Sequence, residues 1–186
     1  MTISPQPPLL IPVEGKDGIK EFKEDHLTFI KVGFGYSLKV FIKAGYRTDG
    51  ASIPTWLQDD EIRKFIKTKY PKIQTRSDLE DLIKFLVGTP WDMPRLLASV
   101  VHDVLYGRKW KFRWLCDKVY RWTLEQVCYD KVRTEIEYAG VRLVGWRNWD
   151  MVTDWEKTQT KRLSDVRFIR TRDIDSEIAM LARKTP

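Results

Sequence analysis

The spacing of apolar residues changes once along this chain, and that change limits the folds that it can adopt. Within residues 37–43 apolar and polar side chains largely alternate, and a period of two predicts a half-buried strand. A second apolar run covers residues 27–32, and the Gly-Phe-Gly sequence at 33–35 between the two runs predicts a hairpin. From Asp59 onward the period is helical. Strands followed by helices predict an α+β fold with N-terminal antiparallel strands.

Capping residues and helix breakers predict the boundaries of the later elements. We expect a single α+β domain over residues 1–145, with an extended arm at 1–12 and a helical insertion at 57–92. Residues 146–186 are expected to form a C-terminal extension that packs on a neighbouring molecule. The expected helices cover about residues 59–70, 77–88, 92–106, 111–128, 131–144 and 175–183, with a short strand at 166–169.

The composition indicates a globular protein with its own core. Of the 186 residues 42% are apolar and 32% charged, and chains of this length bury roughly 70% of the surface that they expose when unfolded. The apolar runs are far shorter than the roughly 20 residues that a membrane span needs. No basic segment precedes an apolar block at the start, so a secretory signal is not expected. Cys116 and Cys128 are expected to be buried and reduced, which fits a reducing cytoplasm.

Basic residues concentrate in one stretch of a chain whose net charge is +7. Residues 108–121 hold six lysines and arginines against one acid, Asp117, and Trp110, Phe112 and Trp114 lie among them. Such a mixture can bind a nucleic-acid strand. The same stretch has a helical apolar spacing, which favours a core stripe with the charges on a solvated face. That stripe would contain Phe112, Leu115, Cys116, Val119, Thr123 and Val127.

The helix expected at 92–106 carries polar residues suited to chemistry. His102 lies almost opposite the apolar face, so it should face solvent, a cleft or another polar element. Tyr106 lies on the same side as His102, and Asp103 lies at the border. The apolar face itself is centred on Leu97, Val100, Val101 and Val104.

Two motifs together suggest a family. The sequence TDGASIP at 48–54 leaves a strand through an Asp-Gly turn, and VHDVLY follows at 101–106, with Asp117 further on. This pair, in this order, resembles a family of domains of unknown function found widely in tailed bacteriophages and prophages. The resemblance covers about residues 40–145. It implies a phage origin and a small α+β fold, and it supplies no established activity.

The helix alone is also similar to the catalytic helix of secreted phospholipases A2, which contains His-Asp-x-x-Tyr. In those enzymes the histidine activates water, the adjacent aspartate binds calcium and the tyrosine supports a partner aspartate. The resemblance implies that His102 is the base, Asp103 the calcium ligand and Tyr106 the support. The cofactor would then be a divalent cation such as calcium.

The residues of the two motifs permit catalysis without that resemblance. A neutral His102, oriented by Asp49 or Asp117, could act as a general base, with Ser52 or a water molecule as the nucleophile. Alternatively, Asp49 and Asp103 could hold a hard metal cation together with carbonyl oxygens.

The same residues also permit a structural arrangement, which we favour. Asp49, His102, Asp103 and Tyr106 would form a buried polar network that fastens the strand exit to the helix. This arrangement requires a side chain of Asp49 or Ser52 to lie within hydrogen-bonding range of His102 or Asp103.

Three functions follow from these observations. The favoured one is a phage-encoded accessory protein of the virion or tail, made in the host cytoplasm and then built into the particle. Its partners would be other phage structural proteins, with homo-oligomers also open, because terminal arms without their own core usually order on a partner. The alternative is a hydrolase of lipid or cell-wall material that uses His102 as general base. Nucleic-acid binding through residues 108–121 ranks third.

Overall fold

The structure, a computed structural model, describes residues 2–3, 10–14, 19–48, 93–127 and 131–182. The helices expected at 59–70 and 77–88 lie outside the described residues, and so do Asp49, Ser52 and Cys128. The expected contacts of Asp49 and Ser52 therefore stay predictions.

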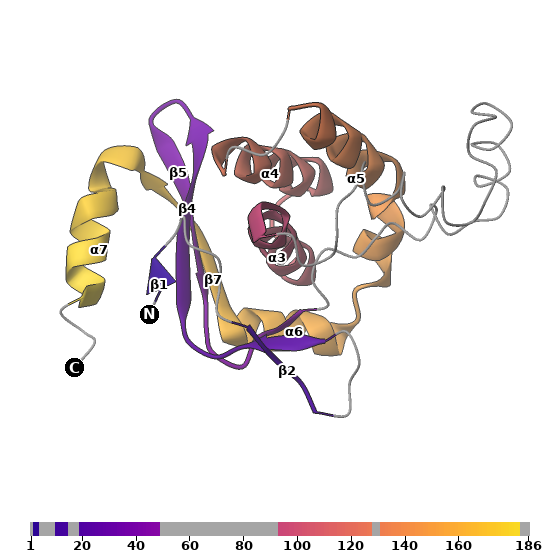
Figure 1. Ribbon diagram of the computed structural model, residues 1–186, viewed down its shortest axis with the longest axis horizontal. Coiled ribbons are helices and arrows are strands. Elements are labelled where there is room, and N and C mark those ends of the chain that lie inside the picture. Colours follow the sequence, from indigo (N-terminus) through magenta and orange to yellow (C-terminus); the bar gives the residue numbers. More distant parts are fainter. Residues whose placement is uncertain (1, 4–9, 15–18, 49–92, 128–130, 183–186) are drawn as a thin grey trace, which may run out of the picture.

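The hairpin predicted from the alternating run is the centre of the fold (Figure 1). β4 (His26–Gly33) and β5 (Tyr36–Ile42) pair antiparallel. β1 (Thr2–Ile3) pairs parallel with β4, and β7 (Ser164–Arg170) pairs antiparallel with β5, which gives the sheet order β1-β4-β5-β7. Helices follow the N-terminal strands along the chain, so the predicted α+β fold is confirmed.

A second, smaller sheet lies beside the first. It consists of β2 (Leu10–Pro12), β3 (Lys20–Phe22) and β6 (Arg47–Thr48) in the order β2-β3-β6. β2 lies within the segment expected to be an extended arm. β6 ends at Thr48, which is the first residue of the TDGASIP motif and the one residue of that motif that the structure describes.

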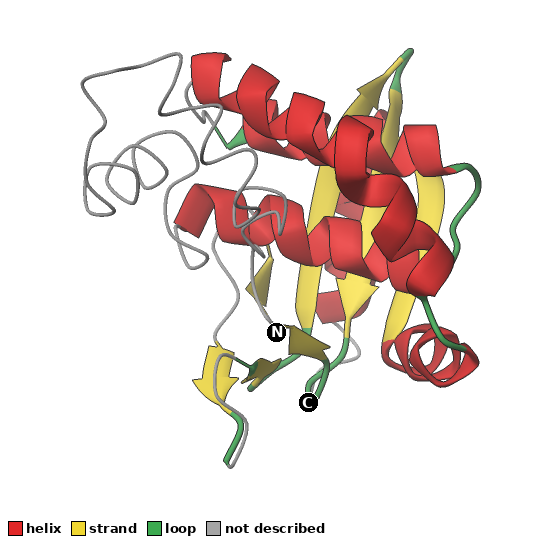
Figure 2. Ribbon diagram, turned by 90° about the vertical axis from the view of Figure 1, so that its right-hand side faces the viewer, coloured by secondary structure: helices red, strands yellow, loops and turns green. Residues whose placement is uncertain are grey.

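Helices cover both faces of the four-stranded sheet. α3 (Met93–Gly107) and α4 (Arg113–Gln126) lie against one face and α7 (Ile174–Ala182) lies on the other (Figure 1), while Figure 2 shows helices in front of the strands. Two side chains of β5 point to the face that α7 covers. Lys39 donates a hydrogen bond to Glu177 in α7, and Ser37 forms a hydrogen bond with Thr171, just before α7, at 3.0 Å. No helix in the described part of the chain is both long and apolar enough to cross a bilayer. The helical segments are α3 (Met93–Gly107), α4 (Arg113–Gln126), α5 (Lys131–Met151), α6 (Asp154–Leu163), the 3-10 helix η2 (Thr171–Asp173) and α7 (Ile174–Ala182).

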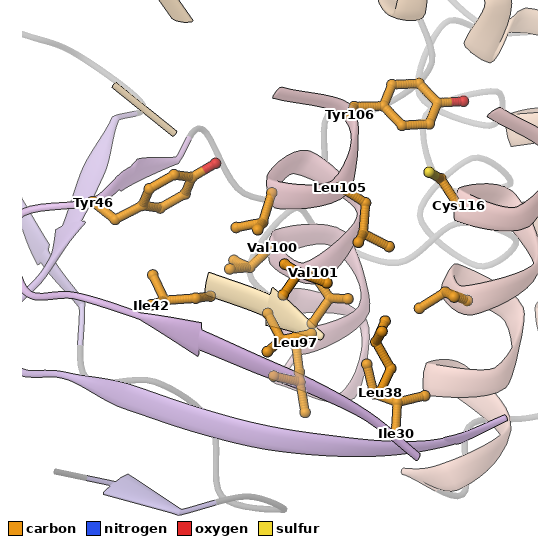
Figure 3. Packing of buried hydrophobic residues seen from close by; sticks show 14 of the residues in the cluster. Ile30, Leu38, Ile42, Tyr46, Leu97, Val100, Val101, Leu105, Tyr106 and Cys116 are labelled. Carbon is orange, nitrogen blue, oxygen red and sulfur yellow. The ribbon is translucent and has the colours of Figure 1, made fainter. Parts of the chain in front are cut away.

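The core lies between the sheet and α3, where the two predicted apolar faces meet (Figure 3). Burying one such aliphatic side chain stabilises the fold by about 1.5–3 kcal/mol relative to leaving it exposed. Because this face of α3 is fixed on the sheet, its polar side faces the other helices. The two elements contribute Leu38, Val40 and Ile42 from β5 and Leu97, Val100, Val101 and Val104 from α3, all of them buried.

α5 is longer than the sequence predicts. The sequence analysis expects a helix that ends before Gly145, whereas α5 continues through this glycine to Met151. A Cβ atom at Gly145 would lie 2.6 Å from the hydroxyl oxygen of Tyr106, which is closer than real Cβ contacts come. The glycine therefore serves close packing against α3 and does not end the helix.

The segment after residue 146 is part of the same fold, which corrects the expectation of a separate extension. α5 runs across that boundary, and Trp149 packs edge-on against Tyr106 with 5.1 Å between ring centroids. Every residue of β7 pairs with a residue of β5. The strand expected at 166–169 and the helix expected at 175–183 correspond to β7 and α7. The physical reason is that β5 has an edge to which only a strand can supply hydrogen bonds.

Candidate functional site

His102 and Tyr106 lie one helical turn apart on the polar side of α3. Because residues four apart share a helix face, the two rings pack against each other in a tilted arrangement, with 4.0 Å between their centroids. In Figure 3, Tyr106 points away from the sheet, toward the end of the helix layer where Cys116 lies. The helical spacing of the sequence predicts this side of α3 for both residues.

Asp117 on α4 is the centre of the site. Its side chain is fully buried. One carboxylate oxygen, Oδ1, accepts hydrogen bonds from His102 Nε2 at 3.1 Å and from the Tyr106 hydroxyl at 2.5 Å. The other, Oδ2, accepts from Arg142 Nη1 at 2.8 Å and pairs with Arg113 Nη1 at 3.4 Å. One carboxylate thus joins α3, α4 and α5.

The bonds to Asp117 decide its charge. Burial alone would raise the pKa of the Asp117 carboxyl, but hydrogen bonds from His102, Tyr106 and Arg142 outweigh burial and hold this pKa below its usual value. For Tyr106, burial and the adjacent carboxylate raise the pKa of the phenol. Asp117 is therefore ionised and Tyr106 is protonated, which is the combination that the short hydrogen bond between them requires.

A second buried group of polar residues adjoins the first. Glu137 on α5 accepts from Arg95 Nε at 3.0 Å, and both side chains are almost fully buried. Tyr120 on α4 donates its hydroxyl to Glu137, and its ring lies edge-on to His102 at 5.3 Å between centroids. The sequence analysis missed this group and Arg142, because their partners lie on different helices. The only signal was that Arg95 lies on the same side of α3 as His102.

A pocket of about 760 Å³ opens beside His102. It is bounded by β6, α3 and α6, and its walls include Trp155, Gln159 and Leu163 from α6. The His102 side chain is 12% exposed, so part of the imidazole faces the pocket while Nε2 holds Asp117. A histidine in this position can exchange protons with a bound molecule.

Thr48, the one described residue of the TDGASIP motif, contacts α3 inside this pocket. The Thr48 hydroxyl donates a hydrogen bond to Asp103 Oδ2 at 3.1 Å, and both residues line the pocket. The proposed cation ligand Asp103 therefore bonds to Thr48, and Asp49 lies outside the described residues. Among the residues that the structure describes, no group of three or more histidine, cysteine, aspartate or glutamate side chains could hold a metal ion.

The basic stretch 108–121 does not form one continuous free surface. Arg113 pairs with Asp117, Arg121 pairs with two glutamates, and Arg108 Nη1 donates to the Ser164 carbonyl at 2.5 Å. The expectation that Phe112 belongs to the core is wrong: its side chain is 65% exposed, because it is the N-cap residue before α4. The expected stripe is buried at Cys116, Val119 and Thr123.

The site therefore combines a buried carboxylate that connects three helices with a histidine open to a pocket. The first feature is typical of a network that fixes a fold, and the second is required of a general base. Comparison with models of known protein families, with curated proteins and with solved structures gives no significant match.

Proposed function

We propose that this chain is a bacteriophage-encoded accessory protein of the virion or tail, in which His102, Tyr106 and Asp117 fix the conformation of the helical half. The observation that carries the structural role is the fully buried Asp117, whose two oxygens accept hydrogen bonds from α3 and α5 and pair with Arg113 on α4. The phage assignment rests on the resemblance carried by TDGASIP and VHDVLY.

The energetics favour a structural role for Asp117. A buried hydrogen bond to a charged group contributes about 1.5–3 kcal/mol, and an unsatisfied buried partner costs about 1–3 kcal/mol. Two arginines, Arg113 and Arg142, already share the charge of this carboxylate. Such a network lets the three helices pack in one arrangement only, because any other arrangement would leave a buried charge without partners.

The proposed place of this chain in the phage particle is tested by mass spectrometry of density-purified phage particles. The chain should be present at a constant ratio to the major structural proteins after a high-salt wash, and a non-structural phage protein serves as the contamination control. Absence of the chain from washed particles, when it is abundant in the infected cell, would contradict the proposal.

The structural role is tested by His102→Ala. Removing a hydrogen-bonded, largely buried partner of Asp117 should destabilise the protein by about 1–3 kcal/mol, which lowers the melting temperature by about 2–12 °C for a chain of this length. Particle assembly should recover at lower temperature. A variant that keeps the wild-type melting temperature but fails to support particle assembly at every temperature would contradict a structural role and favour catalysis.

A second candidate function is hydrolysis, because His102 borders a pocket and is oriented by Asp117. A histidine held by a carboxylate can take a proton from water during attack on an ester or glycosidic bond. Purified protein would be incubated with phospholipid vesicles and with peptidoglycan, beside His102→Ala. Hydrolysis that His102→Ala abolishes supports the enzyme, and no hydrolysis of either substrate removes these two substrate classes.

A further inference from the structure

The tip of the β4–β5 hairpin exposes an aromatic residue in an unfavourable backbone conformation. Phe34 is fully exposed and has a φ of +53°, between Gly33 at +93° and Gly35 at +75°. Residues other than glycine rarely adopt positive φ, because Cβ then meets the backbone. In Figure 1 this tip rises beyond α4 and α7. The exposed ring therefore contributes little to the fold itself, and a role in binding is indicated.

Phe34 forms one wall of an apolar hollow, which we call the aromatic hollow. Its volume is about 340 Å³. Tyr36 and Phe168 contribute partly exposed rings, 46% and 44% accessible, and Trp110 supports Phe168 from behind with 5.2 Å between ring centroids. The hollow is lined by Val32, Gly33, Phe34, Tyr36 and Phe168.

Two cations belong to the segments that build this hollow. Arg170 pairs directly with Tyr36 in the β5–β7 register, so the two side chains share a face of the sheet with Phe168. Lys111 follows Trp110 and is exposed. Neither Arg170 nor Lys111 forms an ion pair with another residue in the part of the chain that the structure describes. Of the acids that follow Arg170 along the chain, Asp173 pairs with Arg172, and Glu177 pairs with Lys39 on the other face of the sheet.

We propose that the aromatic hollow binds single-stranded nucleic acid. One base would stack on Phe34, Tyr36 or Phe168, and the flanking phosphates would lie against Arg170 and Lys111. Aromatic rings combined with unpaired cations are the features that bind single strands without sequence preference, because every base has a stackable face and every linkage a negative charge. The hollow is shallow and open, so a single planar base can lie flat against its rings. This surface is separate from the His102 pocket, so the inference does not depend on the role of His102.

Binding is tested by fluorescence anisotropy with a labelled oligothymidine of roughly 20 nucleotides, a length that exceeds the usual footprint of such sites. Phe34→Ala should weaken binding roughly 5- to 100-fold, the range for loss of one stacked base. Arg170→Ala should reduce the slope of log affinity against log salt by about 0.7, which corresponds to one phosphate contact on a single strand. Trp155→Ala is the matched control, because Trp155 is 70% exposed at the other pocket, and it should bind as the wild type does.

Three results would overturn the proposal. The first is no binding even at low salt. The second is equal weakening by Phe34→Ala and Trp155→Ala, which would show non-specific attraction to a basic protein. The third is Phe34-dependent binding to vesicles of phosphatidylglycerol and phosphatidylcholine without binding to the oligonucleotide, which would assign the tip to membranes. Melting curves of each variant confirm folding, and we expect no change for Phe34→Ala because its ring is exposed.

Discussion

Replacing Gly145 with alanine should destabilise this protein, although alanine is the better helix former. Gly145 lies inside α5, where exchange of glycine for alanine normally stabilises a helix by about 1 kcal/mol. Here the new Cβ would lie 2.6 Å from the hydroxyl oxygen of Tyr106, and real Cβ atoms essentially never come within 3.0 Å of a neighbour. Either the tyrosine or α5 must therefore move.

The size of the effect follows from the hydrogen bond that the tyrosine would lose. Its hydroxyl donates to Asp117 at 2.5 Å, and a bond to a charged group contributes about 1.5–3 kcal/mol. After subtraction of the gain in helix propensity, about 0.5–2 kcal/mol of destabilisation remains. In a Tyr106→Phe background the obstructing oxygen is absent, and the next atoms lie at an ordinary 3.6 Å. There, Gly145→Ala should stabilise by about 1 kcal/mol.

Urea unfolding of the wild type, the two single variants and the double variant measures this coupling as a double-mutant cycle. We expect a coupling free energy of about 1.5–3 kcal/mol and a change of sign for Gly145→Ala between the two backgrounds. If Gly145→Ala destabilises both backgrounds equally, the contact with the hydroxyl is not its cause, and the reasoning fails.

Two further predictions concern ionisable groups. Asp117→Asn should cost about 3 kcal/mol in urea unfolding, since it leaves two arginines beside a neutral amide. Asp154→Asn, at an exposed carboxylate, should leave the urea midpoint nearly unchanged; equal effects would contradict the network. Burial lowers the pKa of His26 from 6.5 to about 4. Between these two pH values the unfolded chain therefore binds more protons than the folded chain does. The free energy of unfolding consequently falls as the pH drops below 6.5. Acidification from pH 7 to pH 5 should therefore cost about 2 kcal/mol through this group; urea midpoints should show it, and His26→Leu should show a correspondingly smaller loss.

The sequence predicts those parts of the fold that depend on local spacing. The period of two in β5 and the apolar stripe of α3 are properties of neighbouring residues, and both apolar faces are buried as expected. The expectation that β5 is only half-buried is wrong, because Ser37 and Lys39 on its polar face are buried as well, where α7 covers that face. The same stripe places His102 on the polar side of its helix. The C-terminal end of α3 is also predictable, because Gly107 is the last residue of the helix.

The sequence does not predict features that depend on contacts between distant elements. Gly145 reads as a helix end, and only the position of Tyr106 shows why a glycine stands inside α5. Arg142 is recognised as a partner of Asp117 only when α4 and α5 are packed together. Phe112 fits the helical spacing of α4 but lies just before its first residue, and a shift of one position changes it from buried to exposed.

The pairing of β7 with β5 has a consequence for synthesis. Leu38 pairs with Phe168, so the hairpin emerges from the ribosome long before the strand that completes its sheet. Until then the edge of β5 keeps its backbone donors and acceptors open, and such edges pair readily with other chains. A chain that stops before Ser164 would keep this edge permanently exposed. β7 can therefore protect the nascent hairpin from aggregation only once translation has passed Arg170.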